Sequence, residues 1–226
     1  SPDRVRPISA LAQEAQVSGF PAEVGVTLVG SCTNSSYEDM SRCADLADQA
    51  AAHGLKMNGS FLVTPGSEQV RATISRDGQQ EALEKIGATV LANACGPCIG
   101  QWRREGAEKG EPNSIVSSYN RNFPRRNDGN GETLNFIASP EIALAMGLGG
   151  RLSFNPLTDT LVGSDGKEFK LEPPKPAPEV PASGFDPGTS GYVAPPEAGA
   201  NVEVSVDASS SRLQVLEPWL AWDGKD

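Results

Sequence analysis

Apolar and polar residues alternate along the first two thirds of the chain in the periods of strands and helices. Residues 24–30, VGVTLVG, are almost continuously apolar, which predicts a strand buried on both faces. Residues 37–54 then carry apolar side chains at helical spacing, and His53 followed by a glycine is a typical helix end. Ser35 or Ser36 can cap the start of this helix.

The same alternation continues downstream. We expect a strand and turn at 59–67, one or two helices at 68–87, a strand at 88–95, a strand and turn at 113–123, and a helix at 139–150. Strand–turn–helix units in succession predict an α/β fold, a three-layer α/β/α domain with a mainly parallel sheet and helices on both faces. Ligands of such sheets gather at the carboxyl ends of the strands, so this edge is the candidate site.

The pattern changes near residue 150. We expect residues 1–172 to form the α/β domain, with its core at about 20–150 and a small hairpin at 151–170. Residues 173–205 are rich in proline and poor in large apolar side chains, which is typical of an extended linker. Apolar residues return in the tail, 206–226, which is too short to fold alone and is expected to dock on a domain absent from this chain.

Composition excludes several classes of function. The 226 residues carry 19 basic and 29 acidic side chains, a net charge of −10, which disfavours non-specific nucleic-acid or anionic-membrane partners. No apolar run is long enough to predict a membrane span. Four cysteines are too few for a disulfide-stapled secreted domain, so a reducing compartment is expected.

Arginines gather in one part of this acidic chain. Arg103, Arg104, Arg121, Arg125 and Arg126 lie within a short stretch, which suits a small anionic ligand. We expect the first two to belong to a solvated surface patch. A guanidinium fork that follows a strand end can bind a carboxylate through two hydrogen bonds, which favours Arg121 as a ligand-binding residue.

The cysteines are the candidate metal ligands. Cys95 and Cys98 form a Cys-x-x-Cys motif, which in isolation fits either a redox dithiol or a metal site. Cys43 lies on the apolar stripe of a predicted helix and is expected to be a buried structural thiol. His53, the single histidine, is better explained as a helix end than as a zinc ligand. Together with Cys32, the pair suits a 4Fe-4S cluster that leaves one iron without a protein ligand.

Four segments together resemble a known family. GSCTNSSYEDM at 30–40, TPGSEQVRATI at 64–74, ANACGPCIGQW at 92–102 and SYNRNFPRRND at 118–128 resemble the mitochondrial-type aconitase family in order and spacing. The resemblance runs from about residue 20 to the end of the chain. It implies a fragment equivalent to the third, cluster-bearing domain of the family plus the linker to the last domain.

The resemblance implies roles for individual residues. It makes three cysteines the cluster ligands: Cys32, Cys95 and Cys98. It puts Asn120 beside the cluster and makes Arg121 and Arg126 the residues that bind substrate carboxylates. The chain departs from the family at Arg125, where a small residue, often glycine, is usual; spacing favours Arg126 over this neighbour.

The activity implied by the resemblance is that of a hydro-lyase that interconverts citrate and isocitrate through cis-aconitate. The partners would be the tricarboxylate and the remaining domains, which would supply the catalytic base, so the chain alone should be inactive. The implied location is the mitochondrial matrix, or the cytoplasm for a bacterial protein. The alternatives are a homoaconitase or methylcitrate-type dehydratase, a non-catalytic iron–sulfur binding module, and a thiol oxidoreductase.

Overall fold

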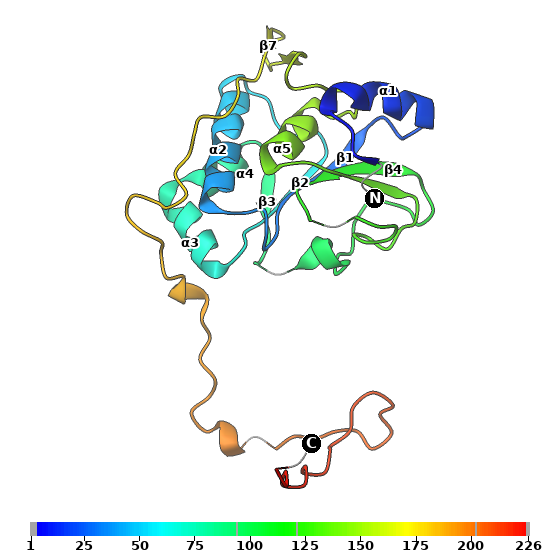
Figure 1. The fold of residues 1–226 in the computed structure, drawn as a ribbon. Coiled ribbons are helices and arrows are strands. Elements are labelled where there is room, and N and C mark those ends of the chain that lie inside the picture. Colours follow the sequence, from blue (N-terminus) through cyan, green and yellow to red (C-terminus); the bar gives the residue numbers. More distant parts are fainter. Residues whose placement is uncertain (1–3, 94, 121, 202, 225–226) are drawn as a thin grey trace. The chain divides into compact units, whose positions relative to one another are not determined.

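The computed structural model describes residues 4–224 except 94, 121 and 202 (Figure 1). The chain divides into two units, Ser1–Gly191 and Tyr192–Asp226. The first unit contains every α-helix and β-strand of the described residues. It therefore contains the whole of the candidate site.

A five-stranded parallel sheet forms the centre of the first unit. Its strands are β1 (Val24–Gly30), β2 (Ser60–Thr64), β3 (Ala88–Val90), β4 (Asn113–Ser117) and β5 (Thr133–Ile137). The order is β3-β2-β1-β4-β5, and every neighbouring pair is parallel. The apolar run of β1 lies at the centre of the sheet, and all of its residues except Gly25 are buried, as predicted for such a strand.

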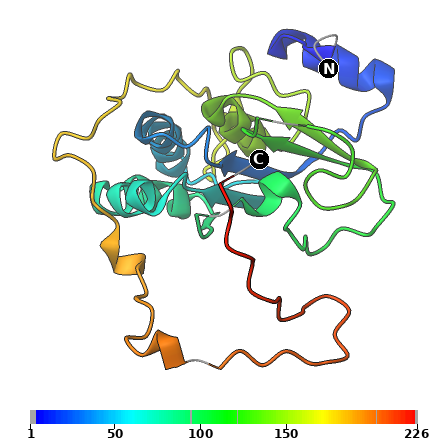
Figure 2. The same cartoon turned by 60° about the horizontal axis from the view of Figure 1, so that its bottom comes forward.

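Helices cover one face of this sheet (Figures 1 and 2). They are α1 (Ile8–Ser18), α2 (Tyr37–Ala52), α3 (Glu68–Asp77), α4 (Gln79–Lys85) and α5 (Pro140–Gly149). The main core packs α2, α4 and α5 against Val29, Phe61 and Val63 of the sheet. A second core joins α1 to α5 and β4 through Ala15, Met146 and Val116. The α/β class with a parallel sheet is confirmed.

The opposite face carries a thinner layer than the helices expected there. A third core packs Cys98 and Trp102 against Val26, Leu28 and Ile115. This layer consists of a short 3-10 helix, η2 (Gly96–Ile99), and its flanking loops. Four glycines at positive φ interrupt the segment between residues 96 and 110, which keeps it from forming an α-helix.

Local hydrogen bonds explain where α2 begins and ends. Ser36 accepts a hydrogen bond from the backbone N–H of Asp39, whose carboxylate accepts one from the backbone N–H of Ser36, a complete capping box. His53 ends the helix, and its ring stacks on Phe169 with centroids 3.9 Å apart. Both predicted ends of this helix are confirmed.

A small hairpin and a pinned strap follow the sheet. Strands β6 (Leu161–Val162) and β7 (Glu168–Phe169) pair antiparallel, which confirms the hairpin. Residues 172–191, which we call the strap, contain only the 3-10 turn η3 (Thr189–Gly191). Lys175 Nζ lies 3.1 Å from Asp45 Oδ1 of α2, and the Phe185 ring meets that of Tyr37 edge-on at 6.3 Å. The strap is therefore held on the helical layer without regular structure.

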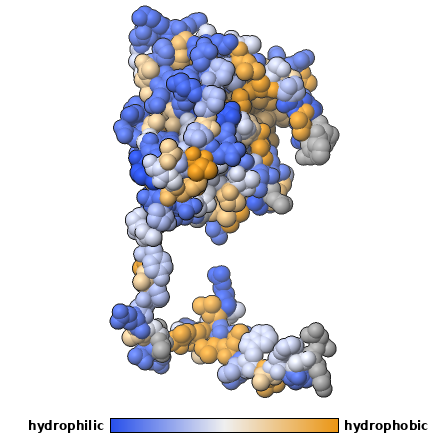
Figure 3. Space-filling view, turned by 60° about the vertical axis from the view of Figure 1, so that its left-hand side comes forward, coloured by the Kyte–Doolittle hydropathy of each residue, from blue (hydrophilic) through white to orange (hydrophobic). Residues whose placement is uncertain are grey.

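The second unit exposes its apolar side chains. Its only regular element among the described residues is the 3-10 turn η4 (Gly199–Asn201). Orange side chains stand out along this unit in Figure 3, and those that are exposed include Leu213, Val215, Leu216, Trp219, Leu220 and Trp222. Across the described part of the chain, no helix has the length and apolar character needed to cross a membrane.

Candidate functional site

The carboxyl ends of the parallel strands meet at one edge, which we call the sulfur edge. The strand order reverses direction between β1 and β4, and such a switch point is where open α/β sheets bind ligands. A cavity of about 90 Å³ lies on one side of this switch point, at the carboxyl ends of β1, β2 and β3, and is lined by Ser31, Cys32, Pro65, Gly66, Asn93, Cys95 and Cys98. The structure thus brings Cys32, which follows β1, to the same cavity as the Cys-x-x-Cys pair that follows β3.

The three thiols at the cavity differ in exposure. Cys32 and Cys95 are exposed, Cys98 is buried, and all are free thiols. Pro97 and the hydrogen bond from the Cys98 backbone N–H to the Cys95 carbonyl (2.8 Å) hold the pair in the 3-10 turn η2. No three His, Cys, Asp or Glu side chains within the described ranges are arranged to hold a metal ion. The thiols therefore share a cavity without being drawn together as ligands.

Polar contacts with β4 fix the loop that carries Cys32. Gly30 donates its N–H to Ser118 Oγ at 2.9 Å, and the side-chain amide of Asn34 donates to the Ser118 carbonyl. Asn120 Nδ2 lies 3.2 Å from Thr33 Oγ1 and donates to it. The predicted site residue Asn120 is thus in contact with the residue that follows Cys32.

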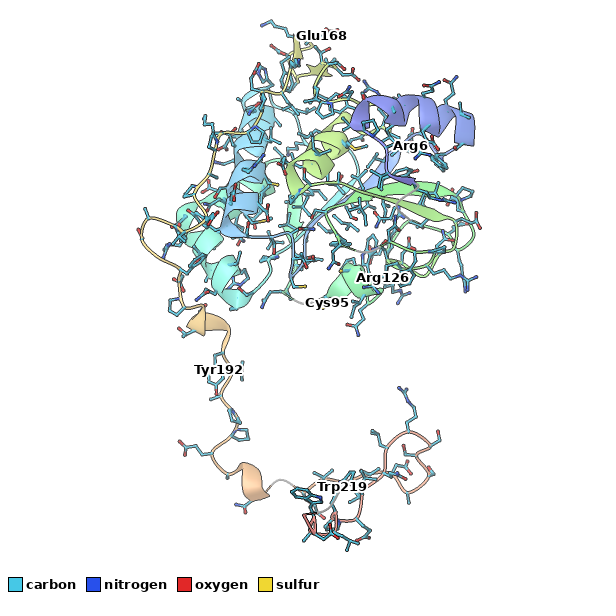
Figure 4. All side chains as sticks on the ribbon, in the orientation of Figure 1. Arg6, Cys95, Arg126, Glu168, Tyr192 and Trp219 are labelled. Carbon is cyan, nitrogen blue, oxygen red and sulfur yellow. The ribbon has the colours of Figure 1, made fainter. Side chains whose placement is uncertain are left out.

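Arg126 lies on a loop that packs against η2. Its side chain is half-buried over the Phe123 ring at 5.0 Å, and its Nε is buried with no hydrogen-bond partner among the residues described. Asn127 donates its side-chain amide to the Pro97 carbonyl at 3.0 Å, which ties the loop to the Cys-x-x-Cys turn. Cys95 and Arg126 lie at one end of the first unit in Figure 4, and Glu168 of the hairpin lies at the other.

The neighbouring arginines differ from Arg126. Arg125 is exposed and has a φ of 66°, a backbone conformation that glycine adopts most readily. A small residue such as glycine would adopt this conformation without strain. Arg121, predicted to bind carboxylate, lies outside the described residues.

Arg104 corrects one expectation from the sequence. Its side chain is 11% exposed, and its Nη1 lies 3.3 Å from the Asp128 Oδ2 of a carboxylate that is 4% exposed. The same nitrogen donates to Asn113 Oδ1 at 2.5 Å. Arg104 is therefore a partly buried residue that joins two loops, and the expectation that it belongs to a solvated patch was wrong. Arg103 is exposed, as expected. The sequence conceals this pairing because Asp128 lies 24 positions further on.

Two chemically reactive side chains lie away from the sulfur edge. Cys43 is fully buried in the main core, and its burial raises the pKa of the thiol well above the usual value, with the carboxylates of Glu141 and Asp39 adding to the effect. His53 packs on the hairpin through Phe169. The structural assignments of Cys43 and His53 are confirmed.

Tyr119 is buried in the third core, which also contains Cys98. It is 1% exposed, and burial raises the pKa of its phenol above the usual range, with Cys98 adding a smaller contribution. The phenol is therefore neutral at physiological pH. Sequence reasoning missed Tyr119, because its burial depends on how the end of β4 packs with Cys98 in the third core.

Comparison with known proteins agrees with this geometry. Residues 5–150 match the model of the aconitase family (aconitate hydratase). The mitochondrial aconitate hydratase of Candida albicans is 56% identical over the whole chain, and those of Gracilaria gracilis and Saccharomyces cerevisiae are 55% identical. The chain spans 29% of the length of each of these three relatives. The matched segment includes all the predicted site residues, and the chain belongs to the aconitase family.

Proposed function

We propose that this chain is the cluster-bearing part of an aconitate hydratase, a hydro-lyase that interconverts citrate and isocitrate through cis-aconitate. The observation that carries the proposal is the single cavity lined by Cys32, Cys95 and Cys98. The names of the relatives support the reaction and a mitochondrial location, which we propose to be the matrix.

The residues at the cavity fit a 4Fe-4S cluster. Cysteine thiolates are the usual ligands of such clusters, and a set of three in place of the usual four leaves one iron without a protein ligand. Two of these thiols lie on exposed loops, so they can close on the cluster as it binds. Gly66 lets β2 approach the Cys32 loop closely, because a Cβ at this position would come within 2.5 Å of Ser35 Oγ and 3.4 Å of the Ser31 carbonyl oxygen. When bound, the cluster supplies a Lewis-acidic iron.

The chain's own residues bind and orient the substrate in this proposal. Arg126 holds a carboxylate, since its half-buried guanidinium has an Nε donor without a partner in the described structure. Arg121 is proposed for a second carboxylate. Asn120 orients the Cys32 loop through its hydrogen bond to Thr33.

The catalytic base is proposed to come from the rest of the protein. Proton transfer by a placed side chain contributes about 10²–10⁴-fold to the rate of such reactions. His53 does not fit this role, because it caps α2 and stacks on the hairpin. We therefore propose that the 226-residue chain has no hydratase activity of its own, even with a cluster bound.

The linker and tail have a role in assembly. We propose that residues 173–205 connect the first unit to the remaining domains and that residues 206–226 dock on one of them. The exposed Trp219 and Trp222 support a docking role, since large apolar side chains in contact with water favour burial against a partner. In the full-length protein, their fluorescence should be shifted to the blue relative to the 226-residue chain.

Anaerobic reconstitution tests the proposal. The protein is incubated with iron and sulfide, and cluster formation is followed by the visible absorption band and by the iron-to-protein ratio. Wild type and Cys43→Ala should bind the cluster, and Cys95→Ala should not. The reconstituted full-length enzyme should convert isocitrate to cis-aconitate, followed by ultraviolet absorbance. A chain that shows only reversible dithiol oxidation, with no cluster, would contradict the proposal.

A further inference from the structure

Ser31 has an unusual backbone and a buried position at the sulfur edge. Its φ is 86°, a region that residues with a Cβ seldom adopt, and only one other non-glycine residue among those described has a positive φ. The residue is 3% exposed and lines the same cavity as the three thiols. Strained backbone of this kind persists where the surrounding structure holds it in place, and it clusters at functional sites.

Both backbone polar groups of Ser31 are hydrogen-bonded, whereas its side-chain hydroxyl has no hydrogen-bond partner among the described residues. The N–H donates to the Thr64 carbonyl at 2.9 Å, and the carbonyl accepts a hydrogen bond from Ser35 Oγ. Ser31 Oγ itself is buried and has no hydrogen-bond partner in the described part of the chain. A buried hydroxyl without a partner costs free energy, so a ligand that satisfies it gains stability.

The other residues that line the cavity leave few acceptors for this hydroxyl. Pro65 and Gly66 have no polar side-chain atom. The amide of Asn93, in the orientation that satisfies both of its polar atoms, donates to Glu68 Oε2 at 3.0 Å and accepts from the Glu68 backbone N–H at 3.0 Å. Among the side chains that line the cavity, the cysteine sulfurs are therefore the acceptors left for this hydroxyl, together with any group that the cysteines bind.

We propose that Ser31 Oγ donates a hydrogen bond to sulfur at this site, either an iron-bound cysteine thiolate or a sulfide of the cluster. The inference rests on the cluster proposed above and extends it to a positioning residue. A hydrogen bond to sulfur withdraws negative charge from the cluster, which stabilises the more negative, reduced state. Ser31 therefore raises the reduction potential of the bound cluster.

Two substitutions separate the hydroxyl from the strained backbone. Ser31→Ala removes the hydroxyl and keeps the Cβ at positive φ, whereas Ser31→Gly removes both. Ser117→Ala is the matched control, because Ser117 Oγ is also buried without a described partner but does not line the cavity. Each variant is made in the full-length protein, reconstituted without oxygen, and titrated for its midpoint reduction potential by electron paramagnetic resonance.

The expected result is the same shift to a lower potential in Ser31→Ala and Ser31→Gly, with no shift in Ser117→Ala. An unshifted potential in Ser31→Gly would overturn the inference, since the effect would then belong to the backbone. The glycine variant also serves if the alanine variant does not fold. Failure of the wild type to take up iron and sulfide would instead refute the proposed function, so the two failures are distinguishable.

Discussion

Cysteine thiols have different surroundings on the helix-covered face of the sheet and at the sulfur edge. On the helical face, Cys43 is sealed at 0% exposure among apolar side chains, and its raised pKa keeps the thiol protonated. At the sulfur edge, Cys32 and Cys95 are exposed, and Ser31 combines a positive φ with an unsatisfied hydroxyl. The helical face is complete without a ligand, whereas the sulfur edge is not. Stability and binding are thus assigned to different parts of one small domain.

A large truncation on the helical face should test this division most strongly. Leu144 of α5 is 0% exposed in the main core. Leu144→Ala should lower the free energy of unfolding by about 2–5 kcal/mol, because it removes buried methyl groups and leaves a cavity. Urea unfolding measures the loss. The folded fraction should keep the wild-type iron-to-protein ratio after reconstitution, and a lower ratio would show that the two regions are coupled.

An added methyl group at the sulfur edge should reduce iron binding, which the truncation on the helical face leaves unchanged. Gly66→Ala places a methyl group close to Ser35 Oγ and the Ser31 carbonyl, at an ordinary φ, so the effect is steric. The free energy of unfolding should fall by about 1–3 kcal/mol, the usual cost of overpacking. The iron-to-protein ratio of the folded fraction should fall, in contrast to Leu144→Ala. Gly199→Ala, at a position with open space around it, is the control and should change neither quantity.

The two serine caps offer a matched pair within the helical layer. Ser36 completes a capping box on α2, whereas Ser139 precedes α5 without a side-chain hydrogen bond. Ser36→Ala should cost about 1 kcal/mol, and Ser139→Ala much less. Thermal or urea unfolding compares them. Equal losses would mean that the hydroxyl of Ser36 contributes nothing beyond the geometry of the helix start.

The smallest expected effect is a pH dependence at the edge of the helical layer. The Arg76 guanidinium lowers the pKa of the Asp77 carboxyl, and the Tyr37 hydroxyl adds a hydrogen bond at 2.9 Å. Because the folded pKa lies below the unfolded one, this stability is present above the unfolded value of about 3.9 and is lost as the pH falls through the folded value.

Asp77→Asn should therefore lower the urea midpoint slightly at pH 7, since exposed ion pairs contribute little. The difference from wild type should disappear in strong acid. A difference that stayed constant with pH would mean that the substitution acts through packing against the strap and not through charge.

Sequence periodicity correctly predicted those helices and strands that carry one clear apolar pattern. The apolar run of β1, the capped amphipathic α2 and the proline-started α5 all lie where expected. Two elements were missed. In β5, Asn135 interrupts the apolar alternation although it is 8% exposed, and α1 lacks a side-chain cap. The predicted strand at 88–95 ends at Val90, because the chain leaves the sheet edge to form the cavity wall.

The residues of the candidate site also fall into two groups, those that the sequence reveals and those whose role is seen only in the folded structure. Cys95 and Cys98 were proposed from motif spacing, which is local in the chain, and the family resemblance added Cys32. Ser31 and Arg104 could not be identified, because their significance lies in a backbone angle, an unsatisfied hydroxyl and an ion pair between separate loops. Such features exist only once distant segments are packed together.

The hydrogen bond between Gly30 and Ser118 joins positions 88 residues apart. This separation in sequence affects the order in which parts of the domain fold. An isolated helix such as α2 can form within about a microsecond, whereas pairing β1 with β4 must first close a long loop at an entropic cost. The thiol that follows β1 therefore meets the Cys-x-x-Cys pair late in folding. If the proposed cluster binds here, its site is complete only after that closure, and until then the three thiols are separate targets for oxidants.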